Sequence, residues 1–299
     1  MDKVTVIGGS GFMGSHVADE LTNRGYDVTI YDVVPSPWLK KNQKMVEGDI
    51  QDLKTLQNCI RDSKYVYHYA GVADIGESAD KPIDTIKTNI VGTATCLEAC
   101  VNENIERFIY ASTVYVYSDR GSFYRASKQS AEIIIESFQD KYDLDYTILR
   151  YGSLYGSRSQ TWNGLRKYVT QAIKNKKILY PGTGHERREY IHANDAANLS
   201  VKALEDKYKN TSLTITGTEV LNSSELLAMV KEIIGEPIKI EFSNDINEMT
   251  TMNYHLIDIH QNQLKRLLLL SLLISVREYS ILSKKSLRKS SKTNHSLIS

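Results

Sequence analysis

Tyr124 and Lys128 lie four positions apart in the segment YRASK, within a stretch that has helical spacing. Residues i and i+4 of a helix share one face, so the phenol and the ammonium would be neighbours. A positive charge beside a phenol favours the phenolate and lowers its pKa. The pair could therefore act as a general base near neutral pH, although an isolated Tyr–Lys pair at this spacing is more commonly an ordinary surface pair.

A run of hydroxyl-bearing residues precedes this pair in the segment YASTVYVY, residues 110–117. The beginning of this segment is typical of a strand. A hydroxyl at the end of that strand could hydrogen-bond the same substrate oxygen as the tyrosine.

Gly8, Gly11 and Gly14 form the spacing G-x-x-G-x-x-G between the first expected strand and the first expected helix. Glycine permits a tight turn, lets the backbone approach a pyrophosphate, and lets the helix pack closely on the strand. The helix N-terminus then presents N–H groups and the positive end of its dipole to an anion. The triplet alone is a weak signal, but its place at a strand–helix junction favours dinucleotide binding.

Asp32 follows Gly14 by eighteen residues and ends the second expected strand. A carboxylate there can accept hydrogen bonds from the adenosine ribose hydroxyls, and it repels a 2′-phosphate. The two residues that follow are valines, and no arginine is present to pair with such a phosphate. The sequence therefore predicts NAD, rather than NADP, as the cofactor.

Strands and helices alternate through the first 150 residues, beginning with a strand, a glycine turn, a helix and a strand. This alternation predicts an α/β fold with a doubly wound parallel sheet covered by helices on both faces. The expected strands are Lys3–Gly8, Tyr26–Tyr31, Lys44–Glu47, Tyr65–Tyr69, Arg107–Ala111 and Tyr146–Arg150. The expected helices are Phe12–Arg24, Leu53–Ile60, Ile83–Val101 and Tyr124–Phe138.

After Arg150 the alternation loosens, which indicates a smaller C-terminal lobe over residues 151–256, with some segments returning to the first sheet. Its expected elements are a helix at Trp162–Asn175, a glycine-bearing loop at Ile178–His185, a helix at Ser223–Ile234 and a strand at Ile238–Phe242. The sequence thus predicts a nucleotide-binding domain over residues 1–150 and a substrate-binding lobe after it.

Residues 257–299 differ in composition from the rest of the chain. They are rich in Leu, Ser, Lys and Ile and carry no Gly or Pro, and the final dozen residues hold too little apolar content to order alone. We consider that a frameshift near Leu256 replaced the native ending. The alternative is an authentic tail with an apolar helix face that packs on the lobe or on a partner, formed by Leu264, Leu267, Leu268 and Leu272.

Composition and charge exclude several classes of protein. The 299 residues are 41% hydrophobic and 24% charged with a net charge of +1, which recruits neither nucleic acid nor an anionic membrane. The apolar run Leu267–Val276 is shorter than the ~20 residues of a membrane span. Cys59, Cys96 and Cys100 show no metal-ligand spacing, and we expect no metal site. With a strand that begins close to Met1, these features predict a cytoplasmic protein.

Several further motifs occur in a fixed order along residues 1–242. They are GGSGFMGSH at 8–16, Asp32, GDI at 48–50, HYAG at 68–71, NIVGT at 89–93, the strand ending in Ser112–Thr113, YxxxK, LRYGSLYG at 149–156 and RREYIHANDAA at 187–197. In this order they resemble the extended short-chain dehydrogenase/reductases. The resemblance is to the NAD-dependent epimerase/dehydratase family, and within it to the UDP-glucose 4-epimerases and related nucleotide-sugar enzymes. It implies a Rossmann-type fold and an NAD-dependent enzyme.

The resemblance also implies roles for individual residues. Tyr124 would be the general base, Lys128 would bind the nicotinamide ribose and tune Tyr124, and Thr113 would be the hydroxyl partner, with Ser112 as its substitute. The residues that would contact the cofactor are Gly8, Gly11, Phe12, Met13, Gly14, Asp32, Asp49, Ile50, Ala70, Gly71, Ala73, Lys81, Asn89 and Tyr151.

On the substrate side, the resemblance assigns Arg188 to a diphosphate, because its planar fork suits phosphate oxygens. The competing interpretation of Arg188 is a solvated surface charge. Ser153 would face the substrate where related enzymes carry an asparagine, so an amide that hydrogen-bonds the nucleotide sugar is missing.

Other departures concern the catalytic segment. Only eleven positions separate Thr113 from Tyr124, and the segment SDRGSF between them is shorter than the epimerase loop. The two residues after Thr113 are valine and tyrosine, whereas the dehydratases carry acids there, so dehydration is disfavoured.

Three functions remain open at this point. The first is a nucleotide-sugar epimerase that acts by transient oxidation at C4. The second is an NAD(H)-dependent reductase of a keto-sugar or another small carbonyl compound, and the third is a catalytically impaired NAD-binding protein. A homodimer through the YxxxK helix would suit the apolar residues Ile133–Ile135, which could equally pack on the sheet.

Overall fold

The structure is a computed structural model, and it describes residues 1–243 of the chain. The expectations for the frameshift near Leu256 and for the tail at 257–299 lie outside these residues.

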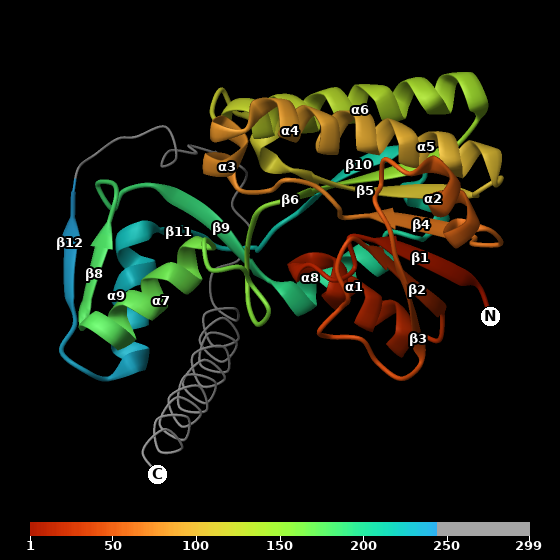
Figure 1. The fold of residues 1–299 in the computed structure, drawn as a ribbon. Helices are drawn as coiled ribbons and strands as arrows, with labels where there is room; N and C mark the ends of the chain where they lie inside the picture. Colours follow the sequence, from red (N-terminus) through yellow and green to blue (C-terminus); the bar gives the residue numbers. More distant parts are fainter. Residues whose placement is uncertain (244–299) are drawn as a thin grey trace, which may run out of the picture.

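Seven parallel strands form the main sheet, in the order β10-β6-β5-β4-β1-β2-β3 (Figure 1). They are β1 (Lys3–Ile7), β2 (Asp27–Asp32), β3 (Gln43–Glu47), β4 (Tyr65–His68), β5 (Arg107–Thr113), β6 (Asp145–Tyr151) and β10 (Thr211–Ile215). The central strands are almost entirely buried because helices cover both of their faces, which explains their continuous apolar runs. The carboxyl ends of the strands meet at one edge, where sheets of this type bind ligands.

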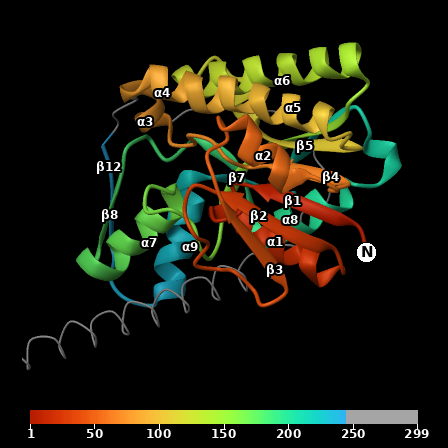
Figure 2. The same ribbon diagram turned by 45° about the vertical axis from the view of Figure 1, so that its right-hand side comes forward.

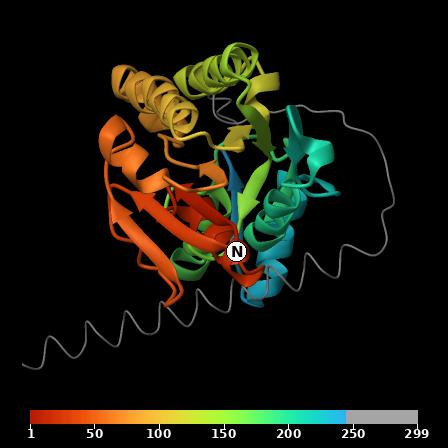
Figure 3. The same ribbon diagram turned by 90° about the vertical axis from the view of Figure 1, so that its right-hand side faces the viewer.

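Two layers of helices enclose this sheet (Figures 1 and 3). Helices α1 (Phe12–Asn23) and α8 (Ala193–Lys202) pack together on one face. Helices α2 (Leu53–Ile60), α5 (Gly92–Asn102) and α6 (Ser122–Tyr142) cover the other face. A separate apolar cluster lies on each side of the sheet. The predicted doubly wound α/β fold is therefore confirmed.

The long helix expected at Ile83–Val101 is interrupted rather than regular. It consists of α4 (Pro82–Ile86), a π-helical turn at Lys87–Val91, and α5. Such turns are rare and frequently occur at functional sites. This one carries Asn89, whose side chain is buried.

The smaller lobe contains two small sheets and two helices (Figure 2). Strands β7 (Ser153–Tyr155), β9 (Arg187–His192) and β11 (Val220–Asn222) form one sheet, and β8 (Lys177–Tyr180) pairs with β12 (Lys239–Phe242) in the other. Helices α7 (Gly164–Asn175) and α9 (Ser223–Ile234) pack against each other. The remaining short elements are α3 (Ile75–Asp80) and two 3-10 turns, η2 (Val114–Tyr117) and η3 (Asp206–Tyr208).

The expectation of a loop at Ile178–His185 is wrong at its beginning, because Ile178 and Tyr180 belong to strand β8. These two side chains are buried and alternate with exposed neighbours, as in a strand with one covered face. Their partner strand β12 lies about sixty residues later in the chain, so local spacing could not reveal the pairing.

Within residues 1–243, the chain crosses between the main sheet and the smaller lobe three times. It leaves at the junction of β6 and β7, returns where β9 runs directly into α8, and leaves again between β10 and β11. The main sheet is therefore completed by β10, a strand that follows much of the lobe in sequence.

Helix α6 divides the apolar residues Ile133–Ile135 between two environments. Ile135 is buried in the core, whereas Ile133 is 63% exposed. Within residues 1–243, no helix combines the length and the apolar content needed to cross a membrane.

Candidate active site

The hydroxyls of Tyr124 and Thr113 meet at the carboxyl edge of the main sheet. Thr113 ends β5, Tyr124 lies in the first turn of α6, and the Thr113 hydroxyl lies close enough to the phenol to influence its pKa. Thr113 Oγ1 also accepts the backbone N–H of Tyr115 at 3.2 Å, so its own O–H can donate to the phenol. The structure thus brings together the proposed base and its proposed hydroxyl partner.

Burial raises the pKa of Tyr124 to about 12, although the neighbouring Thr113 hydroxyl opposes this rise. The sequence predicted the opposite direction, with Lys128 lowering this pKa. The difference arises because desolvation is the largest influence, and because the Lys128 ammonium donates to the carbonyl oxygen of Ala111 at 2.8 Å.

Lys128 is buried one turn after Tyr124, and its Nζ lies 4.7 Å from the centre of the Tyr110 ring. Burial lowers its pKa to about 8, while the charge of Glu132 acts in the opposite direction. A side chain on Gly71 would place its Cβ 3.8 Å from Nζ, so the ammonium faces the loop after β4. This is where the predicted cofactor residues Gly71 and Ala70 lie.

Ser112 does not join this group. Its hydroxyl donates to Glu132 Oε1 on α6, and Glu132 is paired with Arg150 on β6. Adjacent strand residues point to opposite faces, so Ser112 and Thr113 cannot share one partner. The structure therefore separates Ser112 from Tyr124.

The glycine turn between β1 and α1 is packed as a dinucleotide requires. Gly8 has φ +80°, and a Cβ there would lie 2.3 Å from the backbone nitrogen of Ala70. A Cβ on Gly14 would lie 2.2 Å from the carbonyl oxygen of Gly8. Gly11 caps α1 with no side-chain hydrogen bond, so the first N–H groups of the helix, those of Phe12 and Met13, have no partner within it.

Asp32 connects the second strand to this turn. Its Oδ2 accepts the N–H of Ser10 at 3.0 Å, and its Oδ1 accepts the N–H of Val34 at 3.3 Å. The carboxylate therefore lies at the carboxyl end of β2, beside the glycine turn, as a ribose-binding acid should.

Asn89 supports the loop after β4. Its Oδ1 accepts the N–H of Val72 at 2.8 Å, and its Nδ2 donates to the carbonyl oxygen of Val72 at 2.9 Å and to Ser127 Oγ at 2.9 Å. Ser127 in turn donates to the carbonyl oxygen of Tyr124. Asn89 therefore links the loop that carries Ala70, Gly71 and Ala73 to the catalytic helix, and its amide is occupied in doing so.

Four other predicted cofactor residues lie in different settings. Asp49 is exposed, and its carbonyl oxygen accepts the Tyr31 hydroxyl, whereas Ile50 is buried against Gly92. Lys81 is exposed and pairs with a glutamate of its own helix, Glu77, at 3.4 Å. The hydroxyl of Tyr151 is committed to the core, where it contacts those of Tyr69 and Ser200 at 2.6 Å each.

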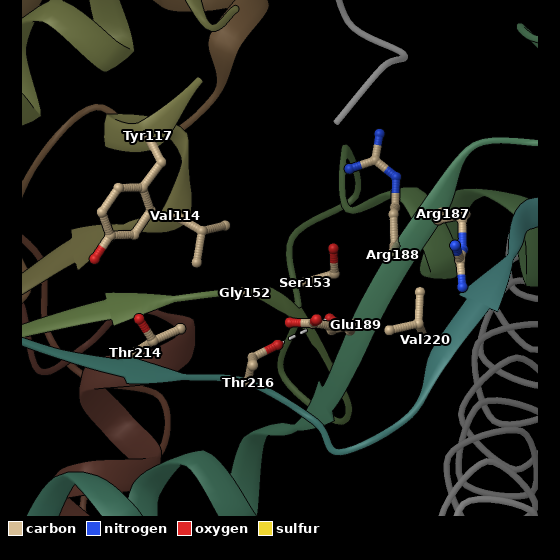
Figure 4. A pocket seen from close by; sticks show the side chains of 10 residues that line it. All are labelled: Val114, Tyr117, Gly152, Ser153, Arg187, Arg188, Glu189, Thr214, Thr216 and Val220. Carbon is tan, nitrogen blue, oxygen red and sulfur yellow. Dashed lines mark hydrogen bonds between the residues drawn. The ribbon is translucent and has the colours of Figure 1, made fainter. Parts of the chain in front are cut away.

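Arg188 and Ser153 line a pocket between the two lobes (Figure 4). Figure 4 shows their side chains on the same side of the pocket, with Val114 and Tyr117 of η2 facing them. The Arg188 guanidinium also lies near the hydroxyl of Tyr115, which raises the arginine pKa. The arginine therefore connects the pocket with the segment that follows Thr113.

Comparison with known proteins decides the family. A model described as the NAD dependent epimerase/dehydratase family matches residues 4–215. The chain belongs to the NAD-dependent epimerase/dehydratase family. It is therefore an NAD-dependent enzyme, and the predicted family and cofactor are confirmed.

Individual members of the family give the same picture. The UDP-glucose 4-epimerase of Azospirillum brasilense is 30% identical over 236 residues, which is 68% of this chain and 68% of that protein. A UDP-N-acetylglucosamine 4-epimerase from Methanobrevibacter ruminantium superposes with a TM-score of 0.83 at 23% identity, covering 94% of this chain and 99% of that one. The UDP-glucose 4-epimerase of Thermotoga maritima superposes with a TM-score of 0.81 at 24% identity, over the same shares of the two chains. The two solved structures establish the shared epimerase/dehydratase fold.

The residues of this family member fit NAD. The clash that any side chain would make at Gly8 or Gly14 leaves a turn shaped by backbone alone, and the acid Asp32 stands beside it. Within residues 1–243, no group of three or more His, Cys, Asp or Glu side chains could hold a metal ion.

Two residues of the site were missed from the sequence, Glu132 and Tyr115. Glu132 follows Lys128 by four positions, so the same helical spacing that paired Tyr124 with Lys128 could have found it. From the sequence, Tyr115 was considered only as a position where the dehydratases carry an acid. Its contact with Arg188 crosses from η2 to β9 and has no local signal.

Proposed function

We propose that this enzyme is an NAD-dependent nucleotide-sugar epimerase that inverts C4 of the sugar by transient oxidation. The observation that carries the proposal is the meeting of the Tyr124 and Thr113 hydroxyls at the carboxyl edge of the sheet, with buried Lys128 one turn away. Two hydroxyls that converge beside a lysine can hold and deprotonate one sugar oxygen. Arg188, in the pocket between the lobes, supplies a cation for the diphosphate of the same substrate.

The residues that would hold NAD are the glycine turn, Asp32 and the loop that carries Gly71. The helix N-terminus behind Gly11 suits the pyrophosphate, Asp32 suits the adenosine ribose, and Lys128 suits the nicotinamide ribose. When bound, NAD would accept a hydride from C4 and later return it to the opposite face of the sugar.

The protein moves one proton in each direction. Tyr124, as its phenolate, would take the proton of the sugar hydroxyl while Thr113 holds the oxygen by a hydrogen bond. In the return step the Tyr124 O–H gives this proton back, so sugar and protein end with the protons they began with. Lys128, one turn away, would bind the nicotinamide ribose and so keep the cofactor beside this proton transfer.

Dehydration lacks a comparable residue. The side chains that follow Thr113 in η2 are those of Val114 and Tyr115, and neither is an acid that could protonate a leaving hydroxyl. The residues therefore favour inversion at C4 over loss of water.

The deciding experiment incubates the protein and NAD with a panel of nucleotide sugars and separates C4 epimers by chromatography. We expect epimerised product without net change in NADH, and none from Tyr124→Phe, which retains the ring. Tyr142→Phe, at the far end of α6, is the matched control and should behave as wild type. Consumption of NADH with a keto-sugar would instead identify a reductase. Binding of NAD with no product from any substrate would identify a catalytically impaired protein.

A further inference from the structure

We propose that Tyr115 is a positioning residue that presets Arg188 for the diphosphate and holds the diphosphate end of the substrate in register with Tyr124. The inference rests on the proposed function and names a residue that the epimerase assignment does not use. Tyr115 lies in η2, two positions after Thr113.

The first observation is the contact with Arg188. The Arg188 guanidinium lies near the hydroxyl of Tyr115, and because an arginine has only N–H donors, the phenol oxygen is the atom that can accept from it. The positive charge of Arg188 also lowers the pKa of Tyr190 on β9, against the larger rise caused by burial. A long side chain held by a phenol before a ligand arrives loses less conformational freedom on binding.

The second observation is the contact with the catalytic tyrosine. The rings of Tyr115 and Tyr124 meet edge to face, with centroids 6.3 Å apart and an interplanar angle of 73°. This is a favourable geometry for two aromatic rings. The backbone N–H of Tyr115 also binds Thr113 Oγ1, so one residue touches both members of the hydroxyl pair.

The third observation is the support behind the ring. Gly121 has φ +105°, and a Cβ built there would lie 3.1 Å from Cδ1 of Tyr115. The short segment before α6 thus packs its backbone closely against this ring. A longer loop could run further from the ring. The contact with Tyr115 therefore goes together with the short length of this segment.

These contacts make Tyr115 a bridge between the anion-binding arginine and the reacting hydroxyls. Its hydroxyl fixes the arginine, while its ring and backbone fix Tyr124 and Thr113. Binding of a nucleoside diphosphate and placement of the sugar are then coupled through one side chain.

The test is a double-mutant cycle on binding of UDP, measured by calorimetry on the full chain with NAD present. Tyr115→Phe keeps the ring and removes the hydroxyl, and we expect UDP to bind about tenfold more weakly, as for loss of a polar partner of a charged group. In the Arg188→Gln background the same change should have almost no further effect, because the partner is already gone. Tyr142→Phe serves as the control and should not alter UDP binding.

Turnover supplies a second readout. For Tyr115→Phe we expect KM for the nucleotide sugar to rise by a similar factor while kcat changes less than twofold. Tyr115→Ala also removes the ring beside Tyr124 and should lower kcat in addition. Unchanged UDP binding by Tyr115→Phe, additive effects in the cycle, or no UDP binding by wild type would each overturn the inference. Because UDP binding needs no turnover, absence of epimerised product would count against the proposed function alone.

Discussion

Glu132 and Arg150 form a two-point ion pair between α6 and β6, with an Oε1–Nε distance of 3.1 Å and an Oε2–Nη2 distance of 2.6 Å. Glu132 lies one helical turn beyond Lys128. Burial lowers the pKa of Lys128 to about 8, and the negative charge of Glu132 opposes this effect. The pair therefore keeps a negative charge beside an ammonium that the proposed reaction needs in its protonated form.

We expect Glu132→Gln to move the alkaline limb of the pH profile of kcat/KM to lower pH. Lys128 is an ammonium only below its pKa, and the variant removes the carboxylate that raises this pKa. Activity should then be lost at lower pH than in wild type. The measurement is kcat/KM across neutral and alkaline pH, and an alkaline limb that stays in place would contradict the role given to Glu132.

Glu136→Gln is the matched control, because Glu136 lies one turn further along α6 and is exposed. Glu132→Gln should also lower the free energy of unfolding by about 2 kcal/mol, since it leaves Arg150 facing a neutral amide in a largely buried setting. Glu136→Gln should change neither the pH profile nor the melting temperature.

The two neighbouring hydroxyls of β5 should behave differently when removed. Thr113→Val takes away the partner of Tyr124 and should lower kcat by about 100-fold or more. Ser112→Ala leaves that pair intact but deprives Glu132 of a hydrogen bond, so stability should fall by about 1–3 kcal/mol with kcat largely retained. Steady-state kinetics and thermal melting of both variants test this. Equal losses of kcat would show that Ser112 also reaches the substrate.

Gly14→Ala should weaken NAD binding by at least about tenfold and lower the melting temperature. The added Cβ would lie 2.2 Å from the carbonyl oxygen of Gly8, so the turn that holds the pyrophosphate must shift. Gly25→Ala is an informative comparison, because its Cβ meets no atom within 4 Å and its φ of +88° adds only backbone strain. Calorimetry with NAD should find normal affinity for Gly25→Ala. A Gly14→Ala protein with normal affinity would remove the turn from the cofactor site.

Asp32→Asn should reduce the preference for NAD over NADP. The amide oxygen can still accept the Ser10 N–H, so the turn keeps its shape, while the charge that repels a 2′-phosphate is gone. We expect weaker NAD binding and measurable NADP binding. Glu47→Gln, an exposed change on the neighbouring strand, controls for net charge. If the ratio of the two affinities stays unchanged in Asp32→Asn, another residue selects the cofactor.

Most of the nucleotide-binding half of the fold could be predicted from local pattern. Strands that are buried on both faces give continuous apolar runs, and the glycine turn marks the junction of β1 and α1. The parts that were missed depend on distant partners. Strand β8 becomes a strand by pairing with β12, and β10 by joining the edge of the main sheet beside β6.

The site shows the same division. The spacing of Tyr124 and Lys128 is local and placed both residues on one helix face. The choice between Ser112 and Thr113 depended on which side chain of α6 each hydroxyl meets, Glu132 or Tyr124, and the direction of the Tyr124 pKa depended on burial. Neither the partner of each hydroxyl nor the burial of Tyr124 can be inferred from neighbouring residues, because both depend on how the helices pack on the sheet.

The three crossings between the main sheet and the smaller lobe limit how the two parts can move and how the chain can be divided. A single linker would allow the lobe to swing in any direction, whereas three strand connections permit rotation only about an axis that passes near all of them. Nor can the nucleotide-binding part be isolated by stopping the chain after β6, because the edge strand β10 is made later. During synthesis the main sheet can therefore be completed only after most of the smaller lobe has been made.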